Sequence, residues 1–292
     1  MNAVSPARVI WVAVDSTGDH PSLSLALAAI PDAAVDKPYV IKIAPGIYTE
    51  TEPVVLKTYV DVEGSGQNTT TINCACITGN AAVISATTIT AEIRHLTINN
   101  TGGGFLAFGV YTDSVADGSF SMLHVTATAT GSTGNYGVNN TSSSPSMNNV
   151  TATATGGTTG AGVYNFGSSS PSMNNVTATA TGGIGNYGVY NISSSPSMNN
   201  VTATGEKIAD NGLSTAFGVY NSDSSAPVIS SSPSIRNSSI TGSTNSIRNS
   251  GTSSAQVADT MLGGPVVAGG GVACVGVYDT DFVATDANCV TP

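Results

Sequence analysis

The sequence has very little charge and few basic residues. Charged side chains make up 9% of its 292 residues, against about a quarter in ordinary soluble domains. The 18 acidic residues outnumber the 8 basic ones, which gives a formal net charge of −10. Nucleic-acid binding needs a basic patch, and no part of the chain supplies one. We therefore expect no nucleic-acid partner.

Long apolar runs are also missing. No stretch approaches the roughly 20 apolar residues of a membrane-spanning helix, and the opening Met1-Asn2-Ala3-Val4 does not resemble a signal peptide. We expect no membrane span and no signal peptide in this chain. A surface rich in Ser, Thr, Asn and Gly and poor in Lys is typical of secreted solenoids, so the sequence favours an extracellular or cell-surface location.

Cysteine and histidine are scarce, with four and three residues respectively. Cys274 and Cys289 lie in a glycine-rich tail and can close a loop. Cys74 and Cys76 fall on the same side of any strand, and we expect them not to bond to each other. Neither pair has the spacing of a usual zinc site, so we expect no metal and no cofactor.

Helix-period leucines are absent from most of the chain, and a repeat takes their place. Its clearest copies run from Tyr136 to Gly157, Ala161 to Gly183 and Tyr187 to Gly205, within a repetitive stretch from Phe108 to Gly242. The methionines at 122, 147, 173 and 198 are 25, 26 and 25 residues apart. A fixed period in this range indicates a solenoid, in which each unit packs only against its neighbours.

The residues within one unit predict short strands and turns. Residues 150–155 (VTATAT) alternate apolar and polar with period two, and clusters of Gly, Ser, Asn and Pro separate the strands. Such a unit suits one rung of a parallel β-helix. We therefore predict an all-β, single-stranded parallel β-helix spanning residues 1–292 as one domain. Residues 1–72 would form the N-terminal cap and first rungs, 73–107 early rungs, 108–242 the regular repeats, and 243–292 the last rung and C-terminal cap.

Stacked rungs place equivalent residues about 4.8 Å apart. Three inward rows are expected, the first built on methionine, the second on the valine that begins VTATAT, and the third on the valine of GVY. The members are Ile93, Met122, Met147, Met173, Met198 and Ile235; Leu96, Val125, Val150, Val176 and Val201; and Val110, Val138, Val163, Val189 and Val219.

A recurring asparagine marks the bend between the first two rows. Asparagine tolerates left-handed backbone and can bond to the rungs on either side, so we predict a ladder of Asn149, Asn175, Asn200 and Asn237. His95 and His124 occupy the matching positions of earlier rungs. We interpret both as structural substitutes for asparagine.

Both ends depart from the repeat. Residues 22–30 (SLSLALAAI) form the one convincing helix, with Ser22 as N-cap, and it would cover the open end of the solenoid core. At the other end, residues 257–267 predict a last strand and turn.

Residues 9–72, above all Pro45-Gly46-Ile47-Tyr48-Thr49-Glu50 and Asp61-Val62-Glu63-Gly64-Ser65-Gly66, resemble the start of pectin methylesterases and the wider pectin lyase-like superfamily. The resemblance covers about the first quarter of the chain, and it implies a right-handed helix with three sheets and carbohydrate-active chemistry. No counterpart of the family's QAV, QDT, DFIFG or LGRPW blocks is present. Residues 119–205 contain no Asp, Glu, Lys or Arg, whereas glycoside hydrolysis normally needs two carboxyl groups.

The remaining acids are weak catalytic candidates. They are Asp113 and Asp117 in a loop of the first full rung, and Glu206 and Asp210 in an insertion between rungs. Departures from a strict repeat often carry function, although turn formation explains these acids equally well. A carbohydrate-active enzyme (a lyase, esterase or hydrolase) is therefore the alternative to a non-catalytic protein.

Two outward rows suggest ligands. Thr151, Thr153, Thr155, Thr177, Thr179 and Thr181 would form an uncharged array like those of ice-binding solenoids, or simply a soluble strand surface. Tyr111, Tyr164, Tyr190 and Tyr220 would face outward in one row with Asn139, free to stack on sugar rings or half covered by a loop. As outward residues, these tyrosines should contribute little to stability. The sequence thus favours a structural or glycan-binding module, with polysaccharide, cell-surface glycan or a second copy as partner.

Overall fold

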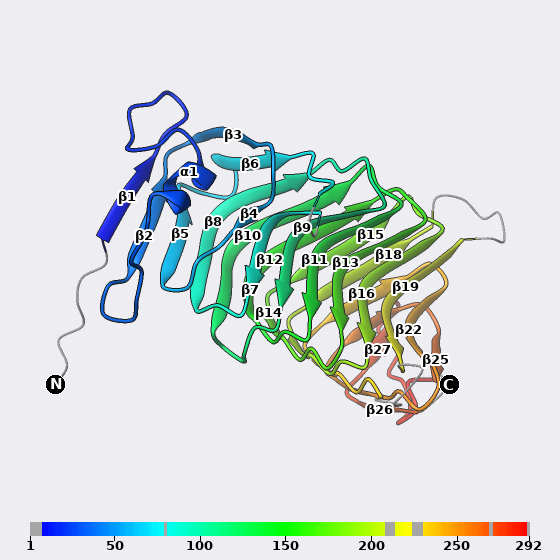
Figure 1. Ribbon diagram of the computed structural model, residues 1–292. Coiled ribbons are helices and arrows are strands. Elements are labelled where there is room, and N and C mark those ends of the chain that lie inside the picture. The colour runs from blue at the N-terminus through cyan, green and yellow to red at the C-terminus, as the bar shows by residue number, and fades with distance from the viewer. Residues whose placement is uncertain (1–7, 79–80, 208–213, 224–229, 269–270, 291–292) are drawn as a thin grey trace.

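The computed structural model describes residues 8–78, 81–207, 214–223, 230–268 and 271–290. This part of the chain forms one short helix and 27 strands, and the strands wind into a parallel β-solenoid (Figure 1). Every strand pairs in parallel with its equivalent one rung away, for example Met122 with Met147 and Met147 with Met173. The described chain contains no helix long and apolar enough to cross a membrane. The predicted fold class is confirmed.

Each rung has three faces, which we name after their outward residues. The serine face contains β1 (Arg8–Val12), β2 (Tyr39–Ile43), β5 (Val60–Gly64), the first halves of β8 (Ala91–Asn100), β10 (Phe120–Thr130) and β12 (Ser146–Thr155), and then β14 (Ser172–Asn174), β17 (Ser197–Asn199), β20 (Ser234–Arg236), β23 (Ala255–Ala258) and β26 (Val272–Val275).

The threonine face follows it around a sharp bend. It contains β3 (Gly46–Glu50), β6 (Thr70–Cys74), the second halves of β8, β10 and β12, and then β15 (Thr177–Thr181), β18 (Thr202–Glu206), β21 (Ser239–Gly242), β24 (Met261–Gly263) and β27 (Tyr278–Asp279). The serine and threonine faces together form one 18-stranded sheet.

The aromatic face is a separate nine-stranded sheet. It contains β4 (Val54–Val55), β7 (Ala82–Thr87), β9 (Leu106–Asp113), β11 (Gly134–Thr141), β13 (Thr159–Phe166), β16 (Gly185–Ile192), β19 (Thr215–Ser222), β22 (Asn245–Asn249) and β25 (Val266–Ala268). Residues 257–267 were predicted as one strand and a turn. They instead span parts of β23, β24 and β25, because the rung pattern continues there with shorter strands.

The three predicted inward rows form the core. All their members are buried and lie in one continuous apolar cluster. Equivalent residues of adjacent rungs stack on each other, so each rung buries the apolar side chains of the next. This stacking takes the place of the single core of a globular domain.

The bend between the serine and threonine faces is a ladder of left-handed residues. Asn149, Asn175 and Asn200 have φ angles of 53°, 54° and 53°. Asn175 Nδ2 donates to Asn149 Oδ1 at 3.2 Å, and Asn200 Nδ2 donates to Asn175 Oδ1 at 2.5 Å, which confirms the predicted ladder. Asn237 shares the conformation but donates to Asn199 instead.

His95 and His124 begin the same ladder. Their φ angles are 57° and 52°, and their rings stack with centroids 5.0 Å apart. They therefore occupy the bend positions that the sequence assigned to them.

A second asparagine ladder, not predicted from the sequence, runs through the interior. Each Nδ2 donates to the Oδ1 of the next asparagine at 2.7 or 2.8 Å, in the order Asn140, Asn165, Asn191, Asn221 and Asn249. Thr112 Oγ1 donates to Asn140 at one end, and Asn249 donates to the Gly271 carbonyl at the other. All five amides are buried, so the ladder satisfies polar groups that would otherwise be stranded in the core.

The predicted helix is α1 (Leu23–Ala28), and it covers the N-terminal end of the solenoid (Figure 1). Leu23, Ala26 and Leu27 are buried, and the Ser22 side chain accepts the Leu25 N–H as N-cap. Buried Glu50 also accepts the N–H groups of Leu23 and Ser24 at 3.0 and 3.3 Å. A carboxylate is favourable there because the helix N-terminus carries partial positive charge.

The motif that carried the family resemblance thus has a structural role in this chain. Within residues 45–50, Glu50 binds the cap helix, and the Tyr48 hydroxyl donates to the Ala44 carbonyl at 2.9 Å. The Glu50 contact attaches the cap helix to β3, and the Tyr48 contact stays within the turn between β2 and β3.

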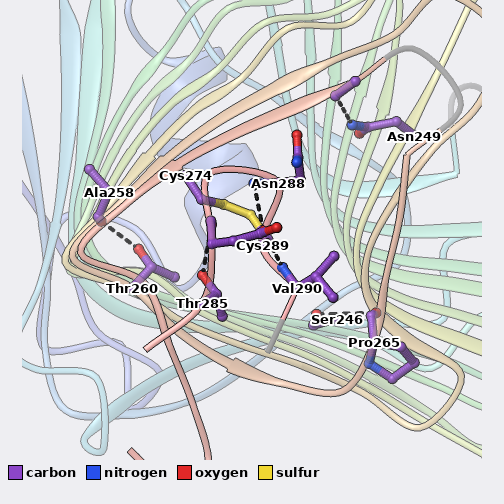
Figure 2. Close-up of a disulfide and its surroundings, with 12 residues drawn as sticks. Ser246, Asn249, Ala258, Thr260, Pro265, Cys274, Thr285, Asn288, Cys289 and Val290 are labelled. Atoms are coloured by element: carbon purple, nitrogen blue, oxygen red, sulfur yellow. Dashed lines mark hydrogen bonds between the residues drawn. A yellow bond between two sulfur atoms is a disulfide. The ribbon is translucent and has the colours of Figure 1, made fainter. Parts of the chain in front are cut away.

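The described chain contains two disulfides. Cys274 on β26 bonds to Cys289 in the terminal segment, which closes the loop that the sequence allowed (Figure 2). The expectation for Cys74 and Cys76 was wrong, because these residues also bond. Both are buried on the same side, but the chain leaves the strand after Cys74. Their Cα atoms are therefore 5.1 Å apart, closer than the roughly 6.7 Å of an extended strand and within reach of a disulfide.

Candidate glycan-binding face

The aromatic face carries a wall of packed rings. We call this group the aromatic wall: Phe108, Tyr111, Tyr136, Tyr164, Phe166, Tyr187, Tyr190, Phe217 and Tyr220. From Tyr136 the ring centroids follow one another along the solenoid to Tyr164 at 5.1 Å, to Tyr190 at 5.2 Å and to Tyr220 at 5.0 Å. The distance between successive rings is therefore nearly the distance between adjacent rungs.

A corner in each strand places two aromatic residues on the same outer side. In β9, Gly109 and Val110 both face inward: a Cβ on Gly109 would lie 3.2 Å from that of Ala127, and Val110 is fully buried in the core. Phe108 and Tyr111 on either side both face outward, with rings 5.5 Å apart. Strict alternation predicts the tyrosine column but turns Phe108, Tyr136, Tyr187 and Phe217 inward, so these four were missed from the sequence. Phe166 was also not predicted.

Where one column lacks an aromatic residue, a ring from the other column lies beside the gap. Asn139 interrupts the column of Tyr111 and Tyr164, and the ring of Tyr136 lies beside that gap, 5.4 Å from Phe108. Glycines make room for the second column, because a Cβ on Gly185 would lie 2.9 Å from the Tyr187 hydroxyl oxygen. The aromatic track is thus continuous although no single column is.

The tyrosines of the wall are half-buried. Neighbouring rings cover part of each one. Burial raises the pKa of the Tyr164 and Tyr190 hydroxyls well above the ordinary value, and that of Tyr136 and Tyr187 as well. These four hydroxyls are therefore uncharged at any physiological pH, and the wall presents ring edges, parts of ring faces and hydroxyl groups.

A shallow apolar hollow of about 430 Å³ adjoins the wall at its N-terminal end. Its lining includes Phe105, Phe108, Tyr111, Asn139 and Thr141. The Phe105 side chain is 76% exposed, so the aromatic surface extends beyond the regular rungs.

The predicted catalytic acids are not brought together. Asp113 ends β9 on the aromatic face and Asp117 lies exposed in the following loop, whereas Glu206 ends β18 on the threonine face. Asp210 lies outside the described residues.

A charged cluster on the serine face was missed by the sequence analysis. Arg94 Nη2 bonds to Glu63 at 2.9 Å, and its Nη1 contacts Glu92 and lies 3.9 Å from Asp61. Lys42 completes the cluster with a 3.2 Å contact to Glu63. The alternation of Asp61 with Glu63 and of Glu92 with Arg94 in adjacent rungs was the available signal.

The carboxyl groups of this cluster differ in pKa. Burial raises the pKa of Asp61. Burial acts in the same direction on Glu63, but its bonds to Arg94 and Lys42 outweigh that effect and hold its pKa below the ordinary value. In the described chain no group of three potential ligands is arranged to hold a metal ion.

The predicted threonine array lies in register on the threonine face. Thr151, Thr153 and Thr155 pair with Thr177, Thr179 and Thr181 on the next rung, and all six are exposed or half-buried. A hollow of about 560 Å³ lies at the N-terminal end of this face. Ice binding there stays a prediction.

The fold is shared with proteins named for polysaccharide chemistry. Pectate lyase Pel9A matches 99% of this chain and 82% of its own length, with a TM-score of 0.65 and 13% identity. Pectin methylesterase from carrot matches 96% and 89%, with a TM-score of 0.57 and 15% identity. The A-module of the mannuronan C-5 epimerase AlgE4 from Azotobacter vinelandii matches 88% and 76%, with a TM-score of 0.54 and 15% identity.

At such identities the likeness shows the fold alone. The chain has the pectin lyase-like right-handed parallel β-helix fold, as the resemblance implied. No protein-family model matches the sequence, and no curated protein sequence matches it.

Proposed function

We propose that this protein is an exported, non-catalytic single-domain β-helix that binds polysaccharide along its aromatic wall. The continuous track of rings from Tyr111 through Tyr136 to Tyr220 carries the proposal. Tyrosine offers an apolar ring for the C–H faces of a sugar and a hydroxyl for its oxygens. A linear row of such sites suits a linear glycan, and the fold neighbours named for pectate, pectin and mannuronan support the same ligand class.

The non-catalytic part of the proposal has separate support. The central strands of the wall, β11, β13 and β16, contain no Asp, Glu, His, Lys or Arg. General acid–base catalysis needs a group that titrates near the working pH, and the buried tyrosines have pKa values far above it.

Removal of two central rings tests the proposal. Tyr164→Ala with Tyr190→Ala should weaken polysaccharide binding in affinity electrophoresis at least tenfold, about 1.4 kcal/mol in total, because each ring removed takes its apolar contact area away from the sugar. The matched control is Thr153→Ala with Thr179→Ala on the threonine face, which should bind as wild type. Unchanged binding by the tyrosine variant would reject the wall as the site.

The ring contacts argue against the expectation that these tyrosines contribute little to stability. Tyr164 and Tyr190 touch rings on both neighbouring rungs, so their loss should also lower the melting temperature. Binding is therefore compared at a temperature where circular dichroism shows both variants folded.

A second candidate, a carbohydrate-active enzyme, is favoured by the charged cluster. The pKa of Asp61 is raised, and the pKa of Glu63, two residues away, is lowered. Two carboxyl groups whose pKa values differ in this way can serve as general acid and general base. Turnover of any polysaccharide that Asp61→Asn abolishes, and that Asp113→Asn does not, would establish this candidate. The proposed function predicts no turnover by wild type.

A further inference from the structure

We infer that the aromatic wall selects a neutral polysaccharide and rejects polyuronates. This inference rests on the proposed function and departs from the acidic glycans in the names of the fold neighbours.

The aromatic face lacks cations where a polyuronate would need them. In its nine strands the only charged residues are Asp113, at the end of β9, and Arg248, in β22. Arg248 is three rungs from Tyr164 along the sheet, or roughly 14 Å at the usual strand spacing. That exceeds the Debye length of about 8 Å at physiological salt, so Arg248 cannot neutralise a ligand at the centre of the wall.

Arg248 is also partly engaged. Its guanidinium carbon lies 5.5 Å from the centre of the Phe217 ring, where it caps the last ring of the wall through a cation–π contact.

A uronate on these rings would lose hydration without gaining a partner. Each sugar carries one carboxylate, and placing an ion against an apolar surface without a counter-charge is strongly unfavourable. The net charge of −10 adds a long-range repulsion toward any polyanion. A neutral sugar carries neither penalty.

The wall supplies what a neutral sugar needs. Thr159 and Thr215 lie beside the rings in the outermost column of the aromatic face, and Thr141 borders its other side. These hydroxyls and those of the tyrosines can donate to and accept from sugar hydroxyls without ion pairing.

The spacing also suits an extended chain. Rings of Tyr164, Tyr190 and Tyr220 follow at 5.2 and 5.0 Å, close to the length of one pyranose unit in an extended β-linked glycan. The ligand would run parallel to the solenoid axis, with one sugar on each rung.

The test compares neutral and acidic polymers on the full chain. Affinity electrophoresis through gels containing xyloglucan, galactomannan, polygalacturonate or alginate gives each dissociation constant at low and physiological salt. We expect at least one neutral polymer to bind tenfold or more tightly than either uronate, with little dependence on salt and with loss of binding in Tyr164→Ala with Tyr190→Ala.

A charge-gain variant sharpens the comparison. Thr159→Lys with Thr215→Lys places two cations beside the wall and should create uronate binding that added salt removes. The control, Thr153→Lys with Thr179→Lys, adds the same charge to the threonine face and should leave binding at the aromatic wall unchanged.

The outcomes separate the two claims. Preferred binding of polygalacturonate or alginate that needs Tyr164 and Tyr190 would overturn the neutral selectivity and leave the proposed function intact. Failure of all four polymers to bind wild type would overturn both.

Discussion

At the scale of the residue, asparagine serves this fold in two ways. The bend residues Asn149, Asn175 and Asn200 are used for their left-handed backbone and are exposed or half-buried. The interior residues Asn140, Asn165 and Asn191 are fully buried and are used for their amides, each of which donates to one neighbour and, within the ladder, accepts from another. The same residue type therefore carries different costs of substitution at the two sites.

We predict that Asn165→Ala destabilises the protein far more than Asn175→Ala. The first change strands the Asn140 donor and the Asn191 acceptor, at about 1–3 kcal/mol for each buried group. The second leaves solvent-exposed partners and costs mainly the left-handed strain of an alanine, about 1–2 kcal/mol. Urea unfolding midpoints measure both.

Asn175→Gly is the matched control at the bend. Glycine adopts positive φ freely, so its cost should fall below that of Asn175→Ala. Equal destabilisation by Asn165→Ala and Asn175→Ala would contradict the burial argument.

We predict that the half-buried tyrosines Tyr164 and Tyr190 make the protein unfold at alkaline pH. In the folded protein the pKa of Tyr164 and Tyr190 is raised by burial, while in the unfolded chain it returns to about 10. A raised folded pKa contributes stability that is complete below the unfolded pKa and is lost as pH rises through the folded one. Stability should therefore fall progressively above about pH 10.

Phenolate absorbance followed together with circular dichroism checks this prediction. Tyr164 and Tyr190 should ionise only as the sheet unfolds, and Tyr164→Phe with Tyr190→Phe should shift the transition to higher pH. Full phenolate titration of a still-folded protein near pH 10 would show that the rings are open to solvent.

At the scale of the element, the corner glycine decides where the aromatic rings point. In β16, a Cβ on Gly188 would lie 2.5 Å from the Thr204 backbone nitrogen and 2.6 Å from the Gly218 carbonyl oxygen. Neither atom can move without breaking the sheet. The equivalent glycines of β11 and β13 have contacts of the same kind.

We predict that Gly188→Ala costs about 1–3 kcal/mol or more through this overpacking. Gly160→Ala in β13 is the control, because its Cβ would meet nothing closer than 3.4 Å. Thermal unfolding should show a lowered midpoint for Gly188→Ala and a nearly unchanged one for Gly160→Ala. A tolerated alanine at position 188 would mean that the corner can relax.

At the scale of the whole molecule, the rung is the unit that can be removed. Met147 pairs with Met173, and Ser146 with Ser172, so residues 147–172 are one complete turn. Each rung contacts only its two neighbours, which makes stability nearly a sum over rungs and interfaces.

We predict that deletion of residues 147–172 leaves a folded, shorter solenoid. Met173 would then stack on Met122 and Asn191 on Asn140, which restores the core row and the interior ladder. Circular dichroism should keep its β-sheet shape with a modestly lower melting temperature. Deletion of residues 147–159, half a rung, should abolish cooperative unfolding because every later strand would move to a different face.

The sequence by itself determined the solenoid, its three inward rows and the bend ladder. These follow from a fixed period and from local alternation: once Met147 faces inward, Met173 and Met198 must do so on identical rungs. The cap helix followed for the same local reason, from Ser22 and the apolar period after it.

Only the tertiary structure decided the features that depend on departures from alternation or on contacts between rungs. The second aromatic column was missed because the strand does not alternate at Gly109 and Val110. The bond between Cys74 and Cys76 was missed because the chain there is not extended. The charged cluster of Arg94 with Asp61, Glu63 and Glu92 needed the register of adjacent rungs. A one-dimensional pattern specifies which side a residue takes on a regular strand, whereas corners and stacking register specify which side chains meet.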